Sequence, residues 1–453
     1  MMLAPKLAVA RAARRASRAL RRGGTVVPGR VLLRLEPRAI AMLAPRLGRG
    51  SVVISATNGK TTTAAMLAAV LQGAGVGLVH NRTGSNMDGG VATAMLDARP
   101  GGGELGLFEV DEAWLPAVAR DLRPHTFLLS NLFRDQLDRY GELAVLAERW
   151  SEMVDEQSER ARLVLNADDP LVADLGRGRP PAQVLYFGVA DDSLALPELQ
   201  HAADSKGCGH CGHAYAYEAA YLAHLGRYAC PNCGQRRPEP EVVADRVVLH
   251  GMSGSIVHVR TPAGALELEL PLPGLYNVYN ALAATATAVS LGIPLDRVKA
   301  GLEGAQAAFG RVETLEIGGR AVSIMLVKNP AGANEVLRTL ALEDGELELW
   351  IALNDRVADG RDVSWMWDAD FEGVAARIGR VTCSGTRAEE MALRMKYAGV
   401  TAPIVVDRDL GRSLDAAVAA GDGRALYALP TYTALLELRG LLADRGVAPR
   451  WSA

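Results

Sequence analysis

The feature that most limits the possible folds is an apolar strand that runs directly into a glycine–lysine–threonine loop and then into a helix. The strand is expected at residues 51–55, the loop is Thr57-Asn58-Gly59-Lys60-Thr61-Thr62, and a helical pattern covers residues 61–72. A loop of this kind points consecutive backbone N–H groups at phosphate oxygens, and the N-terminus of the following helix also favours anions. This order of elements therefore predicts an α/β fold with a phosphate site at the loop.

Single residues of the loop suit separate tasks in holding a magnesium nucleotide. Gly59 permits close approach of the backbone to phosphate, Lys60 is expected to contact the β- and γ-phosphates, and Thr61 offers a hydroxyl to Mg²⁺. The loop is a variant of the general phosphate-binding pattern, because Ile54 stands where that pattern has its first glycine. A chance Gly-Lys-Thr sequence is the alternative, and the position of the loop between a strand and a helix counts against it.

A carboxylate at the end of a neighbouring strand is expected to complete the metal site. The strand expected at residues 105–110 ends in Glu109-Val110-Asp111-Glu112. The carboxyl ends of parallel strands are where open α/β sheets bind ligands, and Mg²⁺ prefers oxygen ligands. Glu109 is the first candidate ligand and Glu112 the second. Taken alone, the tetrapeptide also fits a solvated acidic turn.

Strand-like and helix-like segments alternate over residues 51–291, which predicts a largely parallel sheet with helices on its faces. Further strands are expected at residues 126–130, 162–165 and 184–187, antiparallel strands within 242–270, and later strands at 321–327, 347–353, 380–383 and 425–429. Helices are expected at residues 143–155, 277–291 and 333–342. We therefore expect an N-terminal basic helical segment over residues 1–48, a central nucleotide-binding domain over 49–310 and a C-terminal α/β domain over 311–453.

Four of the five cysteines form two Cys-x₂-Cys pairs in a segment, about residues 203–238, that interrupts this alternation. The pairs are Cys208/Cys211 and Cys230/Cys233, and eighteen residues separate them. Four thiolates at this spacing predict a closed, structural Zn²⁺ site in an inserted ribbon. His210 and His213 are alternative ligands, but we interpret them as neighbours of the site. The remaining Cys383 follows an apolar strand and is interpreted as a buried structural thiol.

The distribution of charge limits partners and location. The net charge of −3 argues against general nucleic-acid binding, which needs a strongly basic domain. No apolar stretch reaches the ~20 residues of a membrane span, and no signal peptide follows the basic start, so a cytoplasmic location is expected. Residues 6–22 hold seven basic side chains and no acid. We favour a basic helix packed on the protein body over one resting on the cytoplasmic face of an anionic membrane, because its apolar face is mostly alanine.

Taken in order, the motifs resemble those of the Mur ligase family. After the loop and Glu109-Val110-Asp111-Glu112 come Asn131-Leu132-Phe133-Arg134-Asp135-Gln136-Leu137-Asp138-Arg139-Tyr140, Asn166-Ala167-Asp168-Asp169, Tyr276-Asn277-Val278-Tyr279-Asn280-Ala281 and Phe309-Gly310-Arg311-Val312-Glu313. The resemblance covers about residues 50–315. It implies an ATP- and Mg²⁺-dependent ligase that converts a carboxylate into an acyl phosphate, which an amine then attacks.

The resemblance also implies roles for single residues. Lys60 and Glu109 are then catalytic, the loop from Thr57 through Asn58, Gly59, Thr61 and Thr62 binds ATP, and Thr61 with Glu109 holds Mg²⁺. Asn277 approaches the adenine and Arg311 the phosphates.

Two positions depart from the amino-acid-adding members of the family. Gln136 stands where those enzymes usually have a histidine, which puts a second-metal contact in doubt. Lys328-Asn329-Pro330 stands at the usual acidic ribose-binding position, so that role is not carried over.

A Mur-like core with a four-cysteine ribbon is similar to one branch of the family, the ligase subunits of lipid II isoglutaminyl synthase. Residues 328–332, 353–365 and 383–387 carry this further resemblance. It implies a heterodimer with a GatD-like glutaminase and amidation of the D-glutamate α-carboxylate in lipid II to D-isoglutamine. An aspartate of the ligase then completes the glutaminase site. Asp355 is the candidate, with Asp359 and Asp362 as alternatives.

Two other functions fit parts of the sequence. A stand-alone Mur or folylpolyglutamate-type ligase would add an amino acid to a carboxylate, and Gln136 and the C-terminal segments count against it. A zinc-ribbon NTPase that binds nucleic acid is the second alternative, and the net charge of −3 counts against it.

Overall fold

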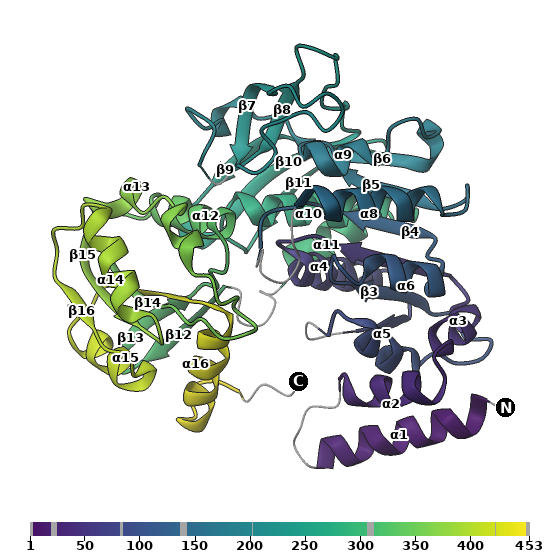
Figure 1. Cartoon of the computed structure of the whole chain (residues 1–453), viewed down its shortest axis with the longest axis horizontal. Coiled ribbons are helices and arrows are strands. Elements are labelled where there is room, and N and C mark those ends of the chain that lie inside the picture. Colours follow the sequence, from purple (N-terminus) through teal and green to yellow (C-terminus); the bar gives the residue numbers. More distant parts are fainter. Residues whose placement is uncertain are drawn as a thin grey trace.

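The computed structural model describes residues 3–19, 25–81, 85–135, 143–201, 203–305, 312–421 and 423–449. The chain forms two α/β lobes that lie side by side, with the N-terminal helices below the larger lobe in the view of Figure 1. A nine-stranded sheet organises the larger lobe and a six-stranded sheet the smaller one. A two-stranded hairpin extends from the larger lobe.

The nine-stranded sheet has the order β11-β10-β9-β6-β5-β4-β1-β3-β2. Its strands are β1 Ser51–Ser55, β2 Leu78–His80, β3 Leu105–Glu109, β4 Thr126–Leu129, β5 Arg162–Asn166, β6 Val184–Val189, β9 Val242–Leu249, β10 Ser255–Thr261 and β11 Gly264–Leu270. All pairs from β2 to β9 are parallel, and β9-β10-β11 are antiparallel. Every residue of β1 is buried, as expected for a central strand covered on both faces.

Helices cover both faces of this sheet and build two apolar cores. On one face pack α4 Lys60–Gly73, α10 Leu275–Ser290 and α11 Leu295–Glu303. On the other pack α1 Leu3–Ala19, α2 Val27–Leu35, α3 Ala39–Leu43, α5 Asp88–Met95, α6 Leu115–Leu122, α8 Leu143–Asp155 and α9 Pro170–Asp174. The expected helix at residues 143–155 is confirmed with these bounds, and the segment expected to be helical over residues 1–48 contains α1, α2, α3 and a 3₁₀ turn.

The N-terminal helix α1 lies against the body of the larger lobe. It packs on α2, and Leu7 and Ala10 are buried in the second core. Lys6 pairs with Glu36 at 2.8 Å, and Arg14 pairs with Asp97 at 2.9 Å. Part of its positive charge is therefore neutralised within the protein.

The smaller lobe has the strand order β12-β13-β17-β14-β15-β16. Its strands are β12 Glu313–Ile317, β13 Arg320–Ile324, β14 Leu347–Ala352, β15 Ile378–Ser384, β16 Ile404–Val406 and β17 Leu426–Pro430. Its helices are α12 Pro330–Leu340, α13 Glu372–Ala375, α14 Ala388–Tyr397, α15 Leu410–Ala419 and α16 Tyr432–Asp444.

Across both lobes, short 3₁₀ turns occupy Ala44–Arg46, Pro181–Gln183, Asp192–Leu194, Gly251–Ser253 and Ser364–Trp367. The predicted α/β class is confirmed, and β2, β12 and β16 were not expected from the sequence.

The inserted segment forms an antiparallel hairpin of β7 Ala216–Leu222 and β8 Leu225–Ala229. At its turn Ala223 has a φ of 47°, a left-handed conformation that is uncommon for a residue with a side chain. The cysteine pairs flank the opposite end of the hairpin, and isolated bridges close each knuckle, Gly207 to Ala214 and Ala229 to Arg236. The hairpin therefore has a cysteine end and a turn end.

Candidate nucleotide site and four-cysteine cluster

The glycine–lysine–threonine loop lies between β1 and α4, at the carboxyl edge of the parallel sheet. Gly59 has a φ of 84°, and a Cβ at this position would lie 2.0 Å from Oδ1 of Asn280, so both the backbone and the space require glycine. The backbone N–H of Asn58 donates to Oδ1 of Asn131 at 2.9 Å, and that of Thr57 donates to the Asn131 carbonyl at 2.9 Å. Residues from two predicted motifs thus hold the loop in one conformation.

Lys60 is buried beneath the loop and is paired with an acid. Its Nζ donates to Oε2 of Glu112 at 2.7 Å and also to the carbonyl of Ala56. Burial alone would lower the pKa of Lys60, but the carboxylates of Glu112, Asp111 and Glu109 outweigh it and raise that pKa. Lys60 is therefore a charged ammonium held at the loop, as contact with phosphate requires.

Thr61 and Glu109, the two predicted Mg²⁺ ligands, lie next to each other. The Thr61 hydroxyl donates to Oε1 of Glu109 at 2.9 Å. Asn81 fixes the backbone of Glu109 through two hydrogen bonds, at 2.9 and 2.7 Å. A hydroxyl and a carboxylate side by side are oxygen donors of the kind that Mg²⁺ accepts, so these residues fit the metal. Glu112, the second candidate, is occupied by Lys60.

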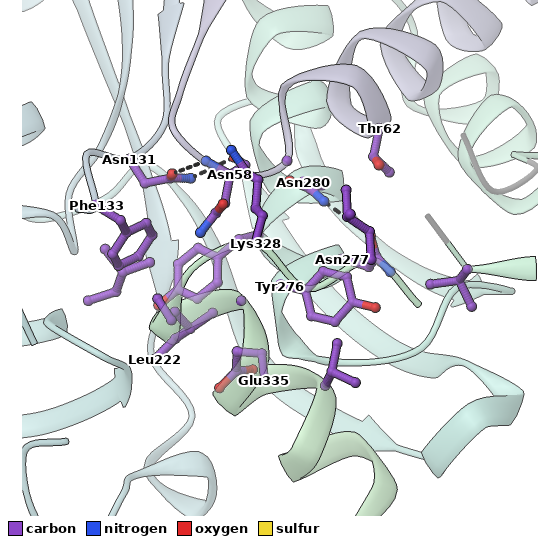
Figure 2. A pocket seen from close by; sticks show the side chains of 18 of the residues that line it. Asn58, Thr62, Asn131, Phe133, Leu222, Tyr276, Asn277, Asn280, Lys328 and Glu335 are labelled. Carbon is purple, nitrogen blue, oxygen red and sulfur yellow. Dashed lines mark hydrogen bonds between the residues drawn. The ribbon is translucent and has the colours of Figure 1, made fainter. Parts of the chain in front are cut away.

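A cleft with about 890 Å³ of empty space, its open mouth included, lies beside the loop and between the two lobes. From the larger lobe it is lined by Asn58, Gly59, Thr62, Asn131, Phe133, Leu222, Leu225, Leu272, Tyr276, Asn277, Tyr279 and Asn280 (Figure 2). From the smaller lobe it is lined by Val312, Leu326, Lys328, Ala331, Gly332, Glu335 and Val336.

Several predicted residues meet in this cleft. Thr62 and Asn277 both line it. The side-chain amide of Asn277 donates to the carbonyl of Pro273 at 2.8 Å and accepts from Asn280 at 3.1 Å, so its orientation is fixed. Gln136 and Arg311 lie outside the described residues.

The cleft also contains residues for which the motifs predict no role. Lys328 donates to the carbonyl of Thr57 at 3.2 Å and pairs with Asp135, so it reaches the loop from the smaller lobe. Leu222 and Glu335 were missed because hairpin and helix patterns do not show which surface they will face. The nearest signal was the departure from the family pattern at Lys328.

The four cysteines form one cluster. Their ligand atoms all lie within 4.8 Å of one another, and Sγ–Sγ distances are 3.5 Å for Cys208–Cys233 and 3.4 Å for Cys211–Cys230. A tetrahedral site with Zn–S bonds of 2.3 Å requires sulfurs about 3.8 Å apart, so the cluster fits Zn²⁺. His210 is not part of it, since its Nε2 contacts Asp174 at 3.0 Å.

Of the three candidate aspartates near the end of β14, Asp355 is the one presented at the surface beside a cation. Its side chain is 35% exposed, accepts from the Thr386 hydroxyl at 2.8 Å and lies 3.2 Å from Arg387. Asp359 is buried and accepts from the backbone N–H of Thr433 at 2.7 Å. The exposed Asp362 accepts from the backbone N–H of Ser364 at 2.8 Å.

Comparison with known proteins places this geometry in a family. Residues 54–233 match the model of the Mur ligase middle domain, and residues 326–435 match that of the MurT ligase C-terminal domain. The lipid II isoglutaminyl synthase (glutamine-hydrolyzing) subunit MurT of Streptococcus pneumoniae (strain ATCC BAA-255 / R6) is 33% identical over 94% of this chain and 93% of its own length. The subunit of the same name from Staphylococcus aureus (strain N315) is 32% identical over 95% of each chain.

Solved structures support the fold. A pseudomurein peptide ligase type C from Methanothermus fervidus superposes with a TM-score of 0.71 at 21% identity, over 89% of this chain and 80% of that one. MurF from Acinetobacter baumannii superposes with a TM-score of 0.65 at 18% identity, over 90% of this chain and 78% of that one. With its Mur ligase fold, its C-terminal match and its relatives over nearly the whole chain, this chain belongs to the MurT family of ligase subunits.

Proposed function

We propose that this chain is the ligase subunit of an enzyme that amidates the α-carboxylate of D-glutamate in the lipid II stem peptide, giving D-isoglutamine. The observation that carries the proposal is the similarity over nearly the whole chain to relatives named lipid II isoglutaminyl synthase subunits. The C-terminal match separates this chain from ligases that share only the middle domain. The cell-wall precursor is therefore its substrate and ATP its energy source.

The chemistry follows from the poor reactivity of a carboxylate. A carboxylate oxygen attacks the γ-phosphorus of ATP, which releases ADP and leaves an acyl phosphate. The nitrogen of ammonia then attacks the carbonyl carbon, phosphate leaves with the bonding electrons, and a proton is lost to give the amide. Bound Mg²⁺ supplies neutralisation of the phosphate charge that develops in the first step.

The residues of the loop perform the positioning. Lys60, itself buried, places a fixed positive charge at the phosphates, where charge develops in the transition state. Thr61 and Glu109 hold the metal, and Thr57, Asn58, Gly59 and Thr62 form the phosphate cradle. The family resemblance assigns Asn277, which lines the cleft, to the adenine and Arg311 to the phosphates.

Ammonia comes from a glutaminase partner in this proposal. Hydrolysis of glutamine needs a reactive thiol, and four of the five cysteines belong to the cluster. The fifth, Cys383, is 0% exposed, and burial raises its pKa to about 12, so it is not a nucleophile at neutral pH. Asp355 is the aspartate offered to the partner, since Asp359 is occupied by Thr433.

The cysteine cluster is proposed to hold a structural Zn²⁺. Four thiolates close the coordination sphere, which leaves no position for water or substrate. The metal would join the two knuckles at the base of the β7–β8 hairpin.

Peripheral contact with the cytoplasmic face of the membrane would bring the enzyme to a lipid-linked substrate. Residues 1–50 contain twelve lysines and arginines and one acid, Glu36. Arg15, Arg34 and Arg38 are exposed, and so is Val9, at 51%. No helix among the described residues is long and apolar enough to cross a bilayer. Co-flotation with anionic but not neutral vesicles, weakened by Arg15→Glu and Arg34→Glu, is the expected result.

The test of the main proposal combines product analysis with a requirement for the partner. The chain is purified with and without a co-expressed glutaminase, given lipid II that carries D-glutamate, and supplied with ATP and either glutamine or ammonium. We expect ADP release and a stem peptide in which NH₂ replaces OH, with glutamine used only when the partner is present. Asp355→Asn should abolish the glutamine-dependent reaction and retain the ammonium-dependent one. Addition of an amino acid instead of an amide would assign the chain to the amino-acid-adding ligases.

A further inference from the structure

Glu335 is a buried carboxylate without a hydrogen-bond partner among the described residues. It lies on α12, the residue is 2% exposed, and neither Oε1 nor Oε2 makes a hydrogen bond within that part of the chain. Burial of a charged group without such partners costs several kcal/mol, so proteins rarely keep one away from functional sites. This cost calls for a ligand that supplies the missing donors.

The nearby arginine does not supply them. Arg338 lies 3.8 Å from Oε1 of Glu335, beyond hydrogen-bond distance. Its guanidinium instead donates to the carbonyls of Tyr221 at 2.6 Å and Leu194 at 2.8 Å, which fixes it on the other lobe. Burial therefore dominates and raises the pKa of Glu335 to about 7, with Arg338 opposing the increase.

Glu335 belongs to the wall of the interlobe cleft, as its place among the labelled side chains of Figure 2 shows. The other titratable side chains that line the cleft are Lys328, Tyr276 and Tyr279. Much of the remaining wall is apolar, including Leu222 and the residues Leu225, Leu272, Leu326 and Val336. The carboxylate is thus a polar acceptor in a largely apolar part of the cleft.

The distance of Glu335 from the loop indicates which part of a nucleotide it meets. Helix α12 starts beside the loop, where its N-cap Asn329 hydrogen-bonds Asn58. Glu335 is six residues farther on, about 9 Å along the axis at 1.5 Å per residue. A nucleotide with its β- and γ-phosphates at the loop places its sugar at about this separation. A carboxylate there also avoids the phosphate charge, which would repel it.

We propose that Glu335 binds the ribose of ATP, its two carboxylate oxygens accepting hydrogen bonds from the 2′- and 3′-hydroxyls. This inference rests on the proposed use of ATP and adds a recognition residue that the sequence motifs do not contain. Two oxygens of one carboxylate match two neighbouring hydroxyls, whereas the adenine amino group offers hydrogens from a single nitrogen. ATP binding then satisfies both orphaned acceptors in one step.

The test compares nucleotides that differ only in the sugar. Calorimetric titration of the purified chain with ATP, 2′-deoxy-ATP and 3′-deoxy-ATP should show about tenfold weaker binding for each missing hydroxyl. Glu335→Ala should weaken ATP binding and reduce the discrimination against both deoxynucleotides to within about twofold. Asp344→Asn, an exposed acid on the same lobe, is the matched control and should keep both. Equal binding of all three nucleotides by the natural chain would overturn the assignment, and so would undiminished discrimination in Glu335→Ala.

A second measurement does not depend on relative affinities. Hydroxyl donors favour the ionised carboxylate, so ATP binding at pH 7 should release about half a proton, seen as a dependence of the binding enthalpy on the buffer. Glu335→Gln should abolish this release while circular dichroism shows the fold unchanged. Proton release that persists in Glu335→Gln contradicts the assignment. Loss of discrimination between ATP and inosine triphosphate in Glu335→Ala, with sugar discrimination kept, would assign Glu335 to the base instead.

These outcomes are separate from those of the amidation assay. A chain that binds ATP and forms the amide, but ignores the sugar hydroxyls, contradicts only the role of Glu335. A chain that discriminates the sugar and forms no amide contradicts only the proposed reaction.

Discussion

Asn58 of the nucleotide loop and Asn329 at the start of α12 hydrogen-bond each other in both directions. Each side-chain NH₂ donates to the other's Oδ1, at 3.3 Å from Asn58 and 3.0 Å from Asn329. The same Oδ1 of Asn329 accepts the backbone N–H of Gly332 at 2.9 Å and so caps the helix. One residue therefore stabilises α12 and joins the smaller lobe to the loop.

The two roles of Asn329 can be separated by substitution. Asn329→Asp keeps an oxygen for the cap but removes the donor to Asn58, so it should raise the KM for ATP about three- to tenfold with little loss of stability. Asn329→Ala removes both and should also cost about 1 kcal/mol of unfolding free energy. Asp409→Ala, which removes the cap of α15 far from the cleft, is the control. It should cost similar stability and leave the KM unchanged; a raised KM there would show that cap loss alone explains the effect.

The buried pair of Lys60 and Glu112 predicts that a second substitution, at Glu112, can restore the stability lost on replacing Lys60 but cannot restore ATP binding. Lys60→Met leaves the Glu112 carboxylate buried without its cation, which should lower the unfolding free energy by about 3–5 kcal/mol. Adding Glu112→Gln removes the stranded charge and should restore most of that loss. Urea unfolding measures the stability of both variants, and titration with ATP measures whether they bind the nucleotide. ATP binding should stay absent in both variants, and its recovery in the double variant would remove Lys60 from the phosphate site.

The local parts of the structure could be predicted because each follows from a short stretch of chain. The strand, loop and helix around Gly59 carry their own signal in the apolar residues of the strand, the spacing of the loop residues and the glycine, which the structure holds in a left-handed conformation. Helix α8, Leu143–Asp155, was predicted with its observed ends from its apolar periodicity. The pairing of the cysteines into one cluster follows from their spacing in the same way.

The cleft could not be predicted, because it depends on how two lobes meet. Asn58 and Asn329 are 271 positions apart, and no periodicity relates them. Glu335 lies in a helical pattern where a glutamate usually reaches solvent, yet in the folded chain it lines the cleft and is buried. The three-residue strand β2 is too short to give a pattern of its own.

The four-cysteine cluster predicts which cysteine substitutions remove zinc from the chain. The natural chain should contain one Zn²⁺ per molecule by elemental analysis, and Cys211→Ser should lose most of it and unfold at a lower temperature. Because the turn of the same hairpin places Leu222 in the cleft wall, ATP affinity should fall as well. Cys383→Ala is the matched control, since Cys383 lies in the core of the smaller lobe. It should keep the zinc, and loss of zinc there would contradict the assignment of the four ligands.

Glu335 makes the stability of the nucleotide-free chain depend on pH. Its pKa is about 7 in the folded protein against 4.5 as the reference value, so the folded state holds the proton more tightly. Stability should therefore fall as pH rises from about 4.5 to 7, by about 3 kcal/mol in total. Glu335→Gln carries no charge at this position and should not lose stability over this pH range.

The difference in stability between Glu335→Gln and the natural chain should depend both on pH and on bound ATP. Without nucleotide, urea unfolding at pH 8 should find Glu335→Gln more stable than the natural chain by about 3 kcal/mol, and the gap should close toward pH 5. Saturating ATP should narrow or reverse the gap at pH 8, because ribose hydroxyls satisfy the carboxylate only in the natural chain. Asp344→Asn, exposed on the same lobe, should show no such gap. A difference between Glu335→Gln and the natural chain that is the same at pH 5 and pH 8 would mean that the carboxylate is already satisfied within the protein.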